Sequence, residues 1–303
     1  MHVVWLCRGR ERANVSELDT GTAHDVTVNG INLHYMTWGN PGGSDRTIIC
    51  IHGISANSQA FLAFGPALAR QGWYVIAPDL RGRGLSDKPR HGYGVPFHAN
   101  DLLSLCDALG LGVTHLVGHS LGAYISVYLA ALYPQRIVKI ALVDGGGKIP
   151  EDAYETISKS TKRLGVVYPS LEDFLHGQRS QSIYQWNDLW ERYYRYDVEE
   201  VPGGGVRSRV SPATMAEEAA TNAALRMDAL TEAVKSPALI ARATVGTLGP
   251  DRGFILPSAE AARMQRVMPH SQLVEIAGAN HYTIVHSDEL ARHINSFLGG
   301  GHA

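Results

Sequence analysis

The sequence predicts an α/β fold in which a mostly parallel central sheet carries helices on both faces. Short apolar runs alternate with segments of helical periodicity up to about residue 148, and the alternation resumes at about residue 236. The apolar runs are continuous, as expected for strands that are covered on both faces. Polar side chains capable of chemistry directly follow several of these runs, at the strand ends where such sheets bind ligands.

The composition is that of a soluble globular protein, with 303 residues, of which 45% are hydrophobic and 18% charged. The net charge is −2 and no long basic run occurs, which argues against nucleic acid or a membrane surface as a main partner. No apolar run is long enough to span a bilayer, and the first residues lack the order of a secretory signal. We therefore expect a cytoplasmic protein, whose oligomeric state the sequence does not indicate.

The first elements form one edge of the expected sheet. Residues 1–23 carry many charges with little periodicity and are interpreted as an N-terminal extension. Two alternating runs, 25–28 and 31–38, flank Asn29-Gly30, a dipeptide that favours a tight hairpin turn. This hairpin would add antiparallel strands to the edge of the sheet.

The next elements alternate between strand and helix. Continuous apolar runs predict buried strands, and the amphipathic segments between them predict helices. Strands are expected at 47–51, 73–77 and 136–143, helices at 57–70 and 97–109, and a strand, a sharp turn and a helix between 114 and 131. Cys50 and Cys106 fall within apolar patterns and are expected to be buried thiols.

The alternation breaks in residues 149–235, which show helical patterns and many aromatic side chains but no convincing buried strand. This segment is interpreted as a helical cap inserted into a core domain made of residues 24–148 and 236–303. The core would resume with strands at 238–244 and 272–276 and helices at 258–267 and 287–297.

The most informative stretch is Gly118-His119-Ser120-Leu121-Gly122, between a predicted strand and a predicted helix. A turn this sharp crowds the residues on either side of its apex, and the two glycines remove the clash. Ser120 at the apex is forced into an unfavourable backbone conformation that projects its hydroxyl beyond the sheet. The following helix directs its N-terminal amides toward that hydroxyl. This geometry suits acyl transfer, in which a serine attacks and an oxyanion must be stabilised.

Over roughly residues 25–298, the chain resembles the α/β-hydrolase fold superfamily. The residues that carry the resemblance are His52-Gly53, Asp79-Leu80-Arg81-Gly82-Arg83-Gly84-Leu85-Ser86, Gly118-His119-Ser120-Leu121-Gly122 and Gly278-Ala279-Asn280-His281. The resemblance implies a serine esterase with a helical cap. Haloalkane dehalogenase and epoxide hydrolase relatives need an aspartate at the apex, so Ser120 argues against both activities.

The resemblance implies that Ser120 is the nucleophile and that His281 is the general base, which takes the serine proton and returns it to the leaving group. His270 and His286 are competing candidates, but His270 belongs to a turn before the last predicted strand and His286 lies near the start of a predicted helix. His119 adjoins the serine at the sharp apex and is interpreted as structural.

Two aspartates compete for the role of the acid that orients His281. The superfamily usually places this acid after the strand predicted at 238–244, which favours Asp251. The run from Asp251 to Pro257 is longer than the usual family spacing, however, and some relatives use the position of Asp144, after the preceding strand. We expect Asp251 to be the acid, with Asp144 as the alternative.

The resemblance also implies an oxyanion hole formed by the backbone N–H groups of Ile54 and Leu121. Most aromatic side chains of the cap are expected to pack it onto the core. Tyr184, Trp186 and Trp190 are candidates for lining an acyl or alcohol pocket.

The sequence thus predicts a hydrolase that cleaves a small-molecule carboxylic ester through an acyl-enzyme. The same residues could cleave a lactone, a thioester or a carbon–carbon bond. The alternative from another class is a receptor-like member of the fold with little turnover. No metal-ligand cluster, dinucleotide fingerprint or prosthetic-group motif occurs in the sequence, so no cofactor is expected.

Overall fold

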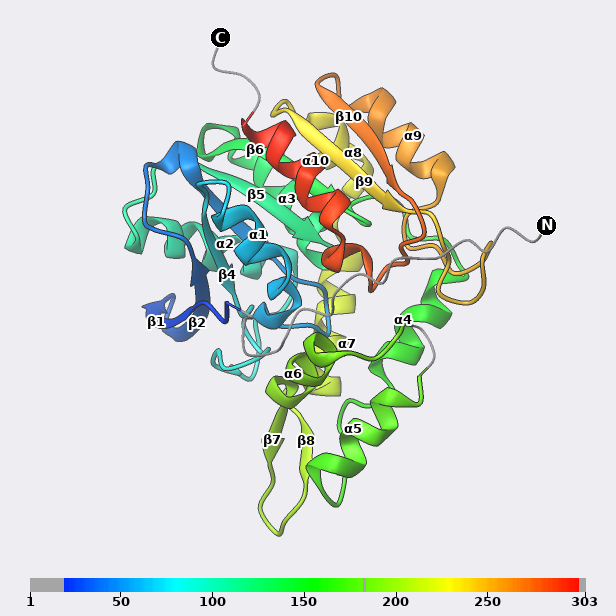
Figure 1. Ribbon diagram of the computed structural model, residues 1–303. Coiled ribbons are helices and arrows are strands. Elements are labelled where there is room, and N and C mark those ends of the chain that lie inside the picture. Colours follow the sequence, from blue (N-terminus) through cyan, green and yellow to red (C-terminus); the bar gives the residue numbers. More distant parts are fainter. Residues whose placement is uncertain (1–18, 182–183, 300–303) are drawn as a thin grey trace, which may run out of the picture.

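A computed structural model describes residues 19–181 and 184–299. Its centre is an eight-stranded sheet with the order β1-β2-β4-β3-β5-β6-β9-β10 (Figure 1). The strands are β1 (Thr22–Val28), β2 (Ile31–Trp38), β3 (Thr47–Ile51), β4 (Tyr74–Pro78), β5 (Thr114–His119), β6 (Ile137–Val143), β9 (Ala238–Ala243) and β10 (Ser271–Ile276). The β1–β2 and β2–β4 pairs are antiparallel, and the other neighbouring pairs are parallel. The predicted fold class is confirmed.

The predicted hairpin at the edge of the sheet is also confirmed. Strands β1 and β2 pair from Val28 opposite Ile31, and Asn29 and Gly30 between them have φ angles of 50° and 76°. Positive φ at both turn residues matches the tight turn whose twist suits an antiparallel pair. Strand β1 begins at Thr22, inside the segment interpreted as an extension, and the first 18 residues of that extension lie outside the described residues.

Helices cover both faces of the sheet. Helices α1 (Phe64–Ala69) and α10 (Asp288–Gly299) pack on one face, and α2 (Val95–Ala108), α3 (Leu121–Leu132) and α9 (Ser258–Val267) on the other. Short 3₁₀ turns occur at η2 (Ser44–Arg46), η3 (Ser58–Phe61), η4 (Pro134–Arg136) and η5 (Ile284–His286). The strand, turn and helix expected between 114 and 131 are β5, an apex at Ser120 and α3.

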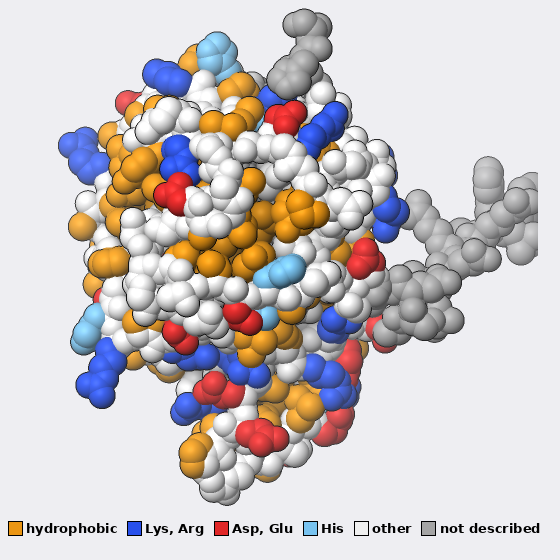
Figure 2. Space-filling model, turned by 90° about the vertical axis from the view of Figure 1, so that its left-hand side faces the viewer, with side chains coloured by type: hydrophobic (Ala, Val, Ile, Leu, Met, Phe, Trp, Pro, Cys, Tyr) orange, Lys and Arg blue, Asp and Glu red, His pale blue; other side chains and the backbone are white. Residues whose placement is uncertain are grey.

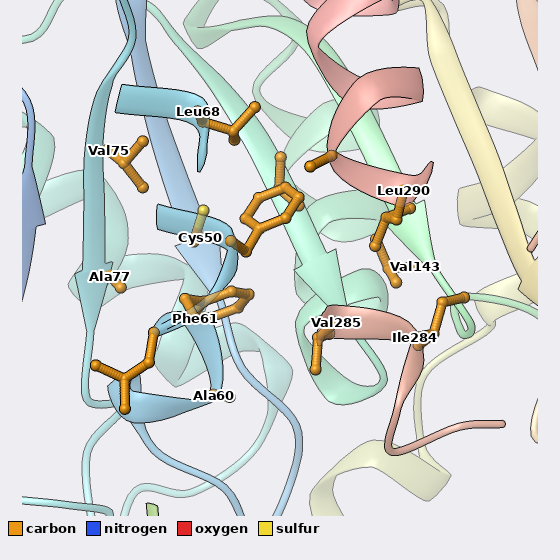
Figure 3. Close-up of a cluster of buried hydrophobic side chains, with 14 of the residues drawn as sticks. Cys50, Ala60, Phe61, Leu68, Val75, Ala77, Val143, Ile284, Val285 and Leu290 are labelled. Carbon is orange, nitrogen blue, oxygen red and sulfur yellow. The ribbon is translucent and has the colours of Figure 1, made fainter. Parts of the chain in front are cut away.

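Strand β3 shows why continuous apolar runs predicted a sheet buried on both faces. Its alternate side chains point to opposite sides: Ile48 and Cys50 join the cluster under α1 and α10, whereas Ile49 and Ile51 join the cluster under α2 and α3. Figure 3 shows the first cluster, with Phe61 and Cys50 between the sheet and the covering helices. Cys50 and Cys106 are free, buried thiols, as expected.

The helix expected at 57–70 is in fact two shorter elements, the 3₁₀ turn η3 and helix α1. The side chain of Asn57 accepts a hydrogen bond from the backbone N–H of Gln59 and caps the first of them. Pro66 has no N–H to donate, so it is tolerated only in the first turn of a helix, and α1 begins two residues before it.

The inserted segment, defined as residues 149–235, lies between β6 and β9. It contains α4 (Ala153–Thr161), α5 (Leu171–Arg179), α6 (Asp188–Asp197), β7 (Val198–Glu200), β8 (Val206–Ser208), α7 (Pro212–Ala223) and α8 (Met227–Ala233). Its first six elements project below the sheet in Figure 1, whereas α8 packs against α3 of the core. The short hairpin of β7 and β8 was not expected from the sequence.

Charged groups of both signs are mixed on the molecular surface. On the face shown in Figure 2, Lys and Arg side chains lie among Asp and Glu side chains around a central group of hydrophobic ones. Within the described residues, no helix combines the length and apolar character needed to cross a bilayer.

Candidate active site

Ser120 stands at the apex of the turn between β5 and α3, with φ 54° and ψ −116°. Few residues other than glycine adopt this backbone conformation, and backbone strain of this kind is common at functional turns. A Cβ on Gly118 would lie 2.1 Å from the carbonyl oxygen of Gly122, and a Cβ on Gly122 would lie 2.0 Å from that of Ile51. Both positions therefore require glycine, as the sequence indicated.

His281 follows β10 and is held by Asp144, which follows β6. The His281 Nδ1 atom lies 2.8 Å from Asp144 Oδ2, and both side chains are buried. The other carboxylate oxygen of Asp144 accepts a hydrogen bond of 3.0 Å from the backbone N–H of Ala243, on the neighbouring strand β9. This arrangement places the proton on Nδ1 and leaves Nε2 of the imidazole as the acceptor.

The prediction that Asp251 contacts His281 is wrong, because the structure brings the alternative, Asp144, to this place. The loop after β9 folds on itself: Leu248 N–H donates to the carbonyl oxygen of Arg252, and Gly249 pairs with Arg252. Asp251 lies in the tight turn that this pairing closes, and its side chain is exposed. The long run after Asp251, noted in the sequence, forms this separate loop.

His119 also contacts His281. Its Nε2–H donates to the backbone carbonyl oxygen of His281 at 2.9 Å, and the two rings lie 4.7 Å apart. Burial, together with the neighbouring His281, holds the pKa of His119 well below its usual value, so this ring stays neutral. His119 thus fixes the backbone of the residue that Asp144 holds by its side chain.

The loop after β3, residues 53–56, faces Ser120. The carbonyl oxygen of Gly53 accepts hydrogen bonds from His52 Nδ1–H at 2.8 Å and from the Ala56 N–H at 3.2 Å. In a trans peptide the N–H of the next residue points the opposite way, so the Ile54 N–H points away from both donors. A Cβ on Gly53 would lie 3.2 Å from Ser120 Cβ, so glycine allows the loop to approach the serine closely.

The second oxyanion donor expected from the sequence, the Leu121 N–H, lies at the N-terminus of α3. Helix α3 begins at Leu121, directly after Ser120. The first N–H groups of a helix have no partner within the helix, and the helix dipole makes them favourable sites for negative charge.

Ser120 and His281 line one cavity of about 70 Å³. Its walls come from the 53–56 loop, the 3₁₀ turn η3, the apex of the serine turn, helices α4 and α6 of the inserted segment, the loop after β9 and the chain after β10. The lining residues are Gly53, Ile54, Ser55, Ala56, Ala60, His119, Ser120, Thr156, Ile157, Ser160, Trp190, Tyr193, Ile255, His281, Tyr282, Val285 and His286. A serine and a histidine oriented by a carboxylate thus meet at one concave site, an arrangement that can support nucleophilic attack on an acyl group.

The comparisons with known proteins agree with this geometry. Residues 46–287 match the family described as the alpha/beta hydrolase fold. The chain is 31% identical over 273 residues to 2-(acetamidomethylene)succinate hydrolase of Mesorhizobium japonicum, covering 84% of this chain and 89% of that protein. The chain belongs to the α/β-hydrolase fold family. It is a hydrolase of that fold.

Solved structures and a further curated relative are also similar to this α/β hydrolase. The crystal structure of E-2-(acetamidomethylene)succinate hydrolase has a TM-score of 0.79 at 27% identity and covers 92% of this chain and 100% of its own. A 2-hydroxy-6-oxononadienedioate/2-hydroxy-6-oxononatrienedioate hydrolase of Burkholderia vietnamiensis is 27% identical over 62% of this chain and 67% of its own. The enol-lactonase of Burkholderia xenovorans LB400, with a TM-score of 0.68 at 20% identity, shares the fold.

The predicted pocket aromatics of this α/β hydrolase are only partly correct. Trp190 lines the cavity, but Tyr184 and Trp186 do not. Tyr184 stacks behind Trp190 with ring centres 3.9 Å apart, and Trp186 stacks on Tyr194 at 5.6 Å. Tyr193 was not among the predicted pocket residues, but it reaches the cavity from the next turn of α6. Its spacing of three residues from Trp190 was the available signal.

The cavity wall is uncharged in the part of the chain that the structure describes. No Asp, Glu, Lys or Arg side chain is among those lining residues. Burial lowers the pKa of His286 to about 4, and burial raises the pKa of Tyr282 to about 12. Both groups are therefore neutral at physiological pH, as is His119. Among the described residues, no group of His, Cys, Asp and Glu side chains has a geometry suited to a metal ion.

Proposed function

We propose that this α/β hydrolase cleaves carboxylic esters through an acyl-enzyme formed on Ser120. The observation that carries the proposal is the buried 2.8 Å contact between Asp144 and His281, at a cavity that Ser120 also lines. A carboxylate, an imidazole and a strained serine in this order are the groups that nucleophilic acyl transfer requires.

In the first half of the reaction, His281 Nε2 takes the proton of the Ser120 hydroxyl as the serine oxygen attacks the acyl carbon. Asp144 accepts the Nδ1–H throughout and stabilises the imidazolium that forms. The N–H groups of Ile54 and Leu121 would donate to the oxyanion of the tetrahedral intermediate. His281 then gives its proton to the departing alcohol, and the ester bond breaks.

In the second half, water replaces the alcohol. His281 takes a proton from the water as it attacks the acyl carbon of the acyl-enzyme, and a second oxyanion forms at the same donors. The carbon–oxygen bond to Ser120 breaks, His281 returns the proton to the serine oxygen, and a carboxylic acid leaves. We further propose that the inserted segment acts as a cap, because Thr156, Ile157 and Trp190 close the cavity from its side.

The character of the wall supports a neutral substrate. A buried carboxylate or ammonium group is costly unless a charged partner compensates for lost hydration, and the described wall offers none. Hydroxyl and aromatic groups, such as those of Ser160 and Tyr193, suit an uncharged acyl or alcohol group of modest size.

A second candidate reaction is hydrolysis of an acetamide. The relative that is 31% identical is named for a substrate that carries an acetamido group and two carboxylates. The proposed catalytic groups could cleave an acetamide by the same steps, with an amine as leaving group. The uncharged wall argues against a dicarboxylate, so this candidate is an acetamide on a neutral compound.

The deciding experiment compares the wild-type protein with Ser120→Ala on nitrophenyl acetate, butyrate and octanoate. We expect turnover of at least one ester, with kcat/KM falling by at least about a thousandfold in the variant. Equal turnover by both proteins would exclude Ser120 as nucleophile. Binding of a neutral ester without turnover by the wild-type protein would favour a receptor-like role.

The substrate class has its own matched pair. Mono-nitrophenyl succinate and nitrophenyl butyrate have acyl chains of similar length and differ chiefly in one carboxylate. We expect the butyrate to be preferred by at least about tenfold in kcat/KM, from the desolvation cost of the charge. Preference for the succinate, or rapid cleavage of 2-(acetamidomethylene)succinate, would contradict the neutral-substrate assignment.

A further inference from the structure

The 53–56 loop is held by two buried arginines that its own sequence does not reveal. Arg83 Nε–H donates to the carbonyl oxygen of Ile54 at 3.0 Å. Arg163 donates from Nη2 to the carbonyl oxygen of the next residue, Ser55, at 2.7 Å. The guanidinium groups thus fix two consecutive peptide groups, those that follow Ile54 and Ser55. The peptide before them, which carries the Ile54 N–H, is fixed by His52 through the Gly53 carbonyl oxygen.

Each of these arginines is paired with a carboxylate from the inserted segment. Arg83 Nη2 bonds Glu218 on α7, and both side chains are fully buried. Arg163 Nε lies 3.0 Å from Asp197 Oδ2 at the end of α6, and these side chains are also buried. We name the two ion pairs, Arg83–Glu218 and Arg163–Asp197, the arginine clasp.

The clasp has additional bonds that fix its geometry. Glu218 Oε1 lies 3.0 Å from His98 Nε2, and Arg83 Nη1 also donates to the carbonyl oxygen of Arg81. Burial opposes the charge of Glu218, but Arg83 and His98 outweigh it and lower the pKa of Glu218 to about 2. Asp197 Oδ2 further accepts a hydrogen bond of 3.0 Å from the Ser208 hydroxyl. The carboxylates are needed because a buried guanidinium without a counter-charge is strongly unfavourable.

We propose that the arginine clasp positions the Ile54 N–H as an oxyanion donor, so that the inserted segment completes the catalytic site of the core. This inference rests on the proposed function, because it concerns the transition state of acyl transfer. Arg83, Arg163, Glu218 and Asp197 are positioning residues: they act on the backbone of the loop and through it on the oxyanion. A donor aimed before the reaction begins stabilises the oxyanion at no reorganisation cost, and loosening it lowers kcat more than substrate affinity.

The test uses Glu218→Gln and Asp197→Asn in the full chain, with Glu172→Gln as the matched control. Glu172 also pairs with an arginine of the inserted segment, Arg179, but Glu172 is exposed. The ion pairs of Arg179 are with Glu172 and Glu191, both in the inserted segment. On the best nitrophenyl ester, we expect each clasp variant to lower kcat by about 10- to 100-fold, with KM changed less than about threefold. The inhibition constant of a trifluoromethyl ketone with the same acyl chain should rise by a similar factor, because this ketone forms the oxyanion.

A second readout does not depend on turnover. Hydrogen exchange of the backbone amides in residues 53–57 should become at least about tenfold faster in the clasp variants and stay unchanged in Glu172→Gln. Clasp variants that remain folded, with kcat, ketone binding and loop exchange all within twofold of the wild type, would overturn the inference.

If a clasp variant fails to fold, Arg83→Lys replaces it: lysine keeps the charge beside Glu218 but loses the fixed fork that reaches Ile54, so the same loss of kcat is expected. Unchanged kcat and loop exchange in a folded Arg83→Lys protein would overturn the inference. If the wild-type protein cleaves no ester, the proposed function fails, and the exchange experiment alone decides whether the clasp holds the loop.

Discussion

The loops after β6 and β9 begin at neighbouring strands of the same sheet, yet only one carries a carboxylate to His281. Asp144 follows β6 directly, and its backbone N–H and one carboxylate oxygen bond to Ala241 and Ala243 of β9. The loop after β9 forms its own turns, with Asp251 exposed at a tip. A strand-end position is therefore not sufficient for a catalytic carboxylate; the neighbouring strand must also hold it.

The largest expected effect separates the two aspartates. We expect Asp144→Asn to lower kcat by about 10³- to 10⁴-fold, because an amide cannot stabilise the imidazolium and favours the wrong tautomer. Asp251→Asn should leave kcat within twofold. Steady-state kinetics on the best nitrophenyl ester measure both effects. A loss of kcat confined to Asp251→Asn would assign the catalytic role to Asp251 instead of Asp144.

Two crowded glycines allow a second comparison between the serine turn and the loop after β9. A Cβ on Gly122 would lie 2.0 Å from the Ile51 carbonyl oxygen at the serine turn, and a Cβ on Gly246 would lie 1.9 Å from the Arg252 carbonyl oxygen in the β9 loop. Each Gly→Ala change should destabilise the fold by about 3 kcal/mol, measured by urea unfolding.

Only Gly122→Ala should also lower the turnover of the folded protein, by at least about tenfold, because it shifts Ser120 and the start of α3. Turnover is to be measured at a temperature where both variants are folded. Similar kinetic losses in the two variants would show that the turn at Gly246 affects catalysis as strongly as the serine turn does.

The 3₁₀ turn η5, in the chain after β10, provides a third case, because both ring nitrogens of its His286 are buried. Among the described residues, neither ring nitrogen of His286 has a hydrogen-bond partner, and burial lowers the pKa of His286 to about 4. The unfolded chain, with a histidine pKa of about 6.5, binds the proton first as pH falls, so stability is lost between about pH 6.5 and pH 4.

This linkage amounts to about 2 kcal/mol at pH 5 relative to pH 8. In His286→Leu that part of the pH dependence should be absent. His293→Leu, which changes an exposed side chain on α10, serves as the control. Urea unfolding at both pH values measures the effect. An equal loss of stability at pH 5 in His286→Leu and the wild type would contradict the assignment.

The smallest expected effect concerns the attachment of the β9 loop to the inserted segment. Asp152 Oδ2 accepts a hydrogen bond of 2.9 Å from the Gly253 N–H, and Thr156 bonds Thr247 nearby. Asp152→Ala should lower stability by about 1 kcal/mol and leave kcat within twofold. Thermal unfolding and kinetics test it, and a tenfold loss of kcat would show that this attachment controls the shape of the cavity that Thr156 and Ile255 line.

Features set by local sequence could be predicted, because the chemistry of a few consecutive residues determines them. The serine turn needed only its two glycines and its flanking strand and helix, and the edge hairpin needed Asn29-Gly30. His281 was found from the family resemblance of Gly278-Ala279-Asn280-His281, in the short segment after the last strand. Each of these patterns spans only a few residues, and its steric requirements allow few other backbone conformations.

The choice between Asp144 and Asp251 could not be made from sequence, because it depends on hydrogen bonds between β6, β9 and the turns of a long loop. Likewise, Trp190 and Tyr184 are both aromatic, and only the packing of α6 on the core decides which of them reaches the cavity. In the arginine clasp, Arg83 and Glu218 are 135 positions apart, and Arg163 is 108 positions from the Ser55 carbonyl that it bonds, so no local pattern marks the clasp.

The roles of Ser120 and Asp144 are tested most directly by covalent labelling with a nitrophenyl phosphonate ester, followed by intact-mass and peptide-mass measurement. We expect a single adduct on Ser120, formed much more slowly in Asp144→Asn and at the wild-type rate in Asp251→Asn. Labelling at another residue, or full-rate labelling of Asp144→Asn, would contradict it.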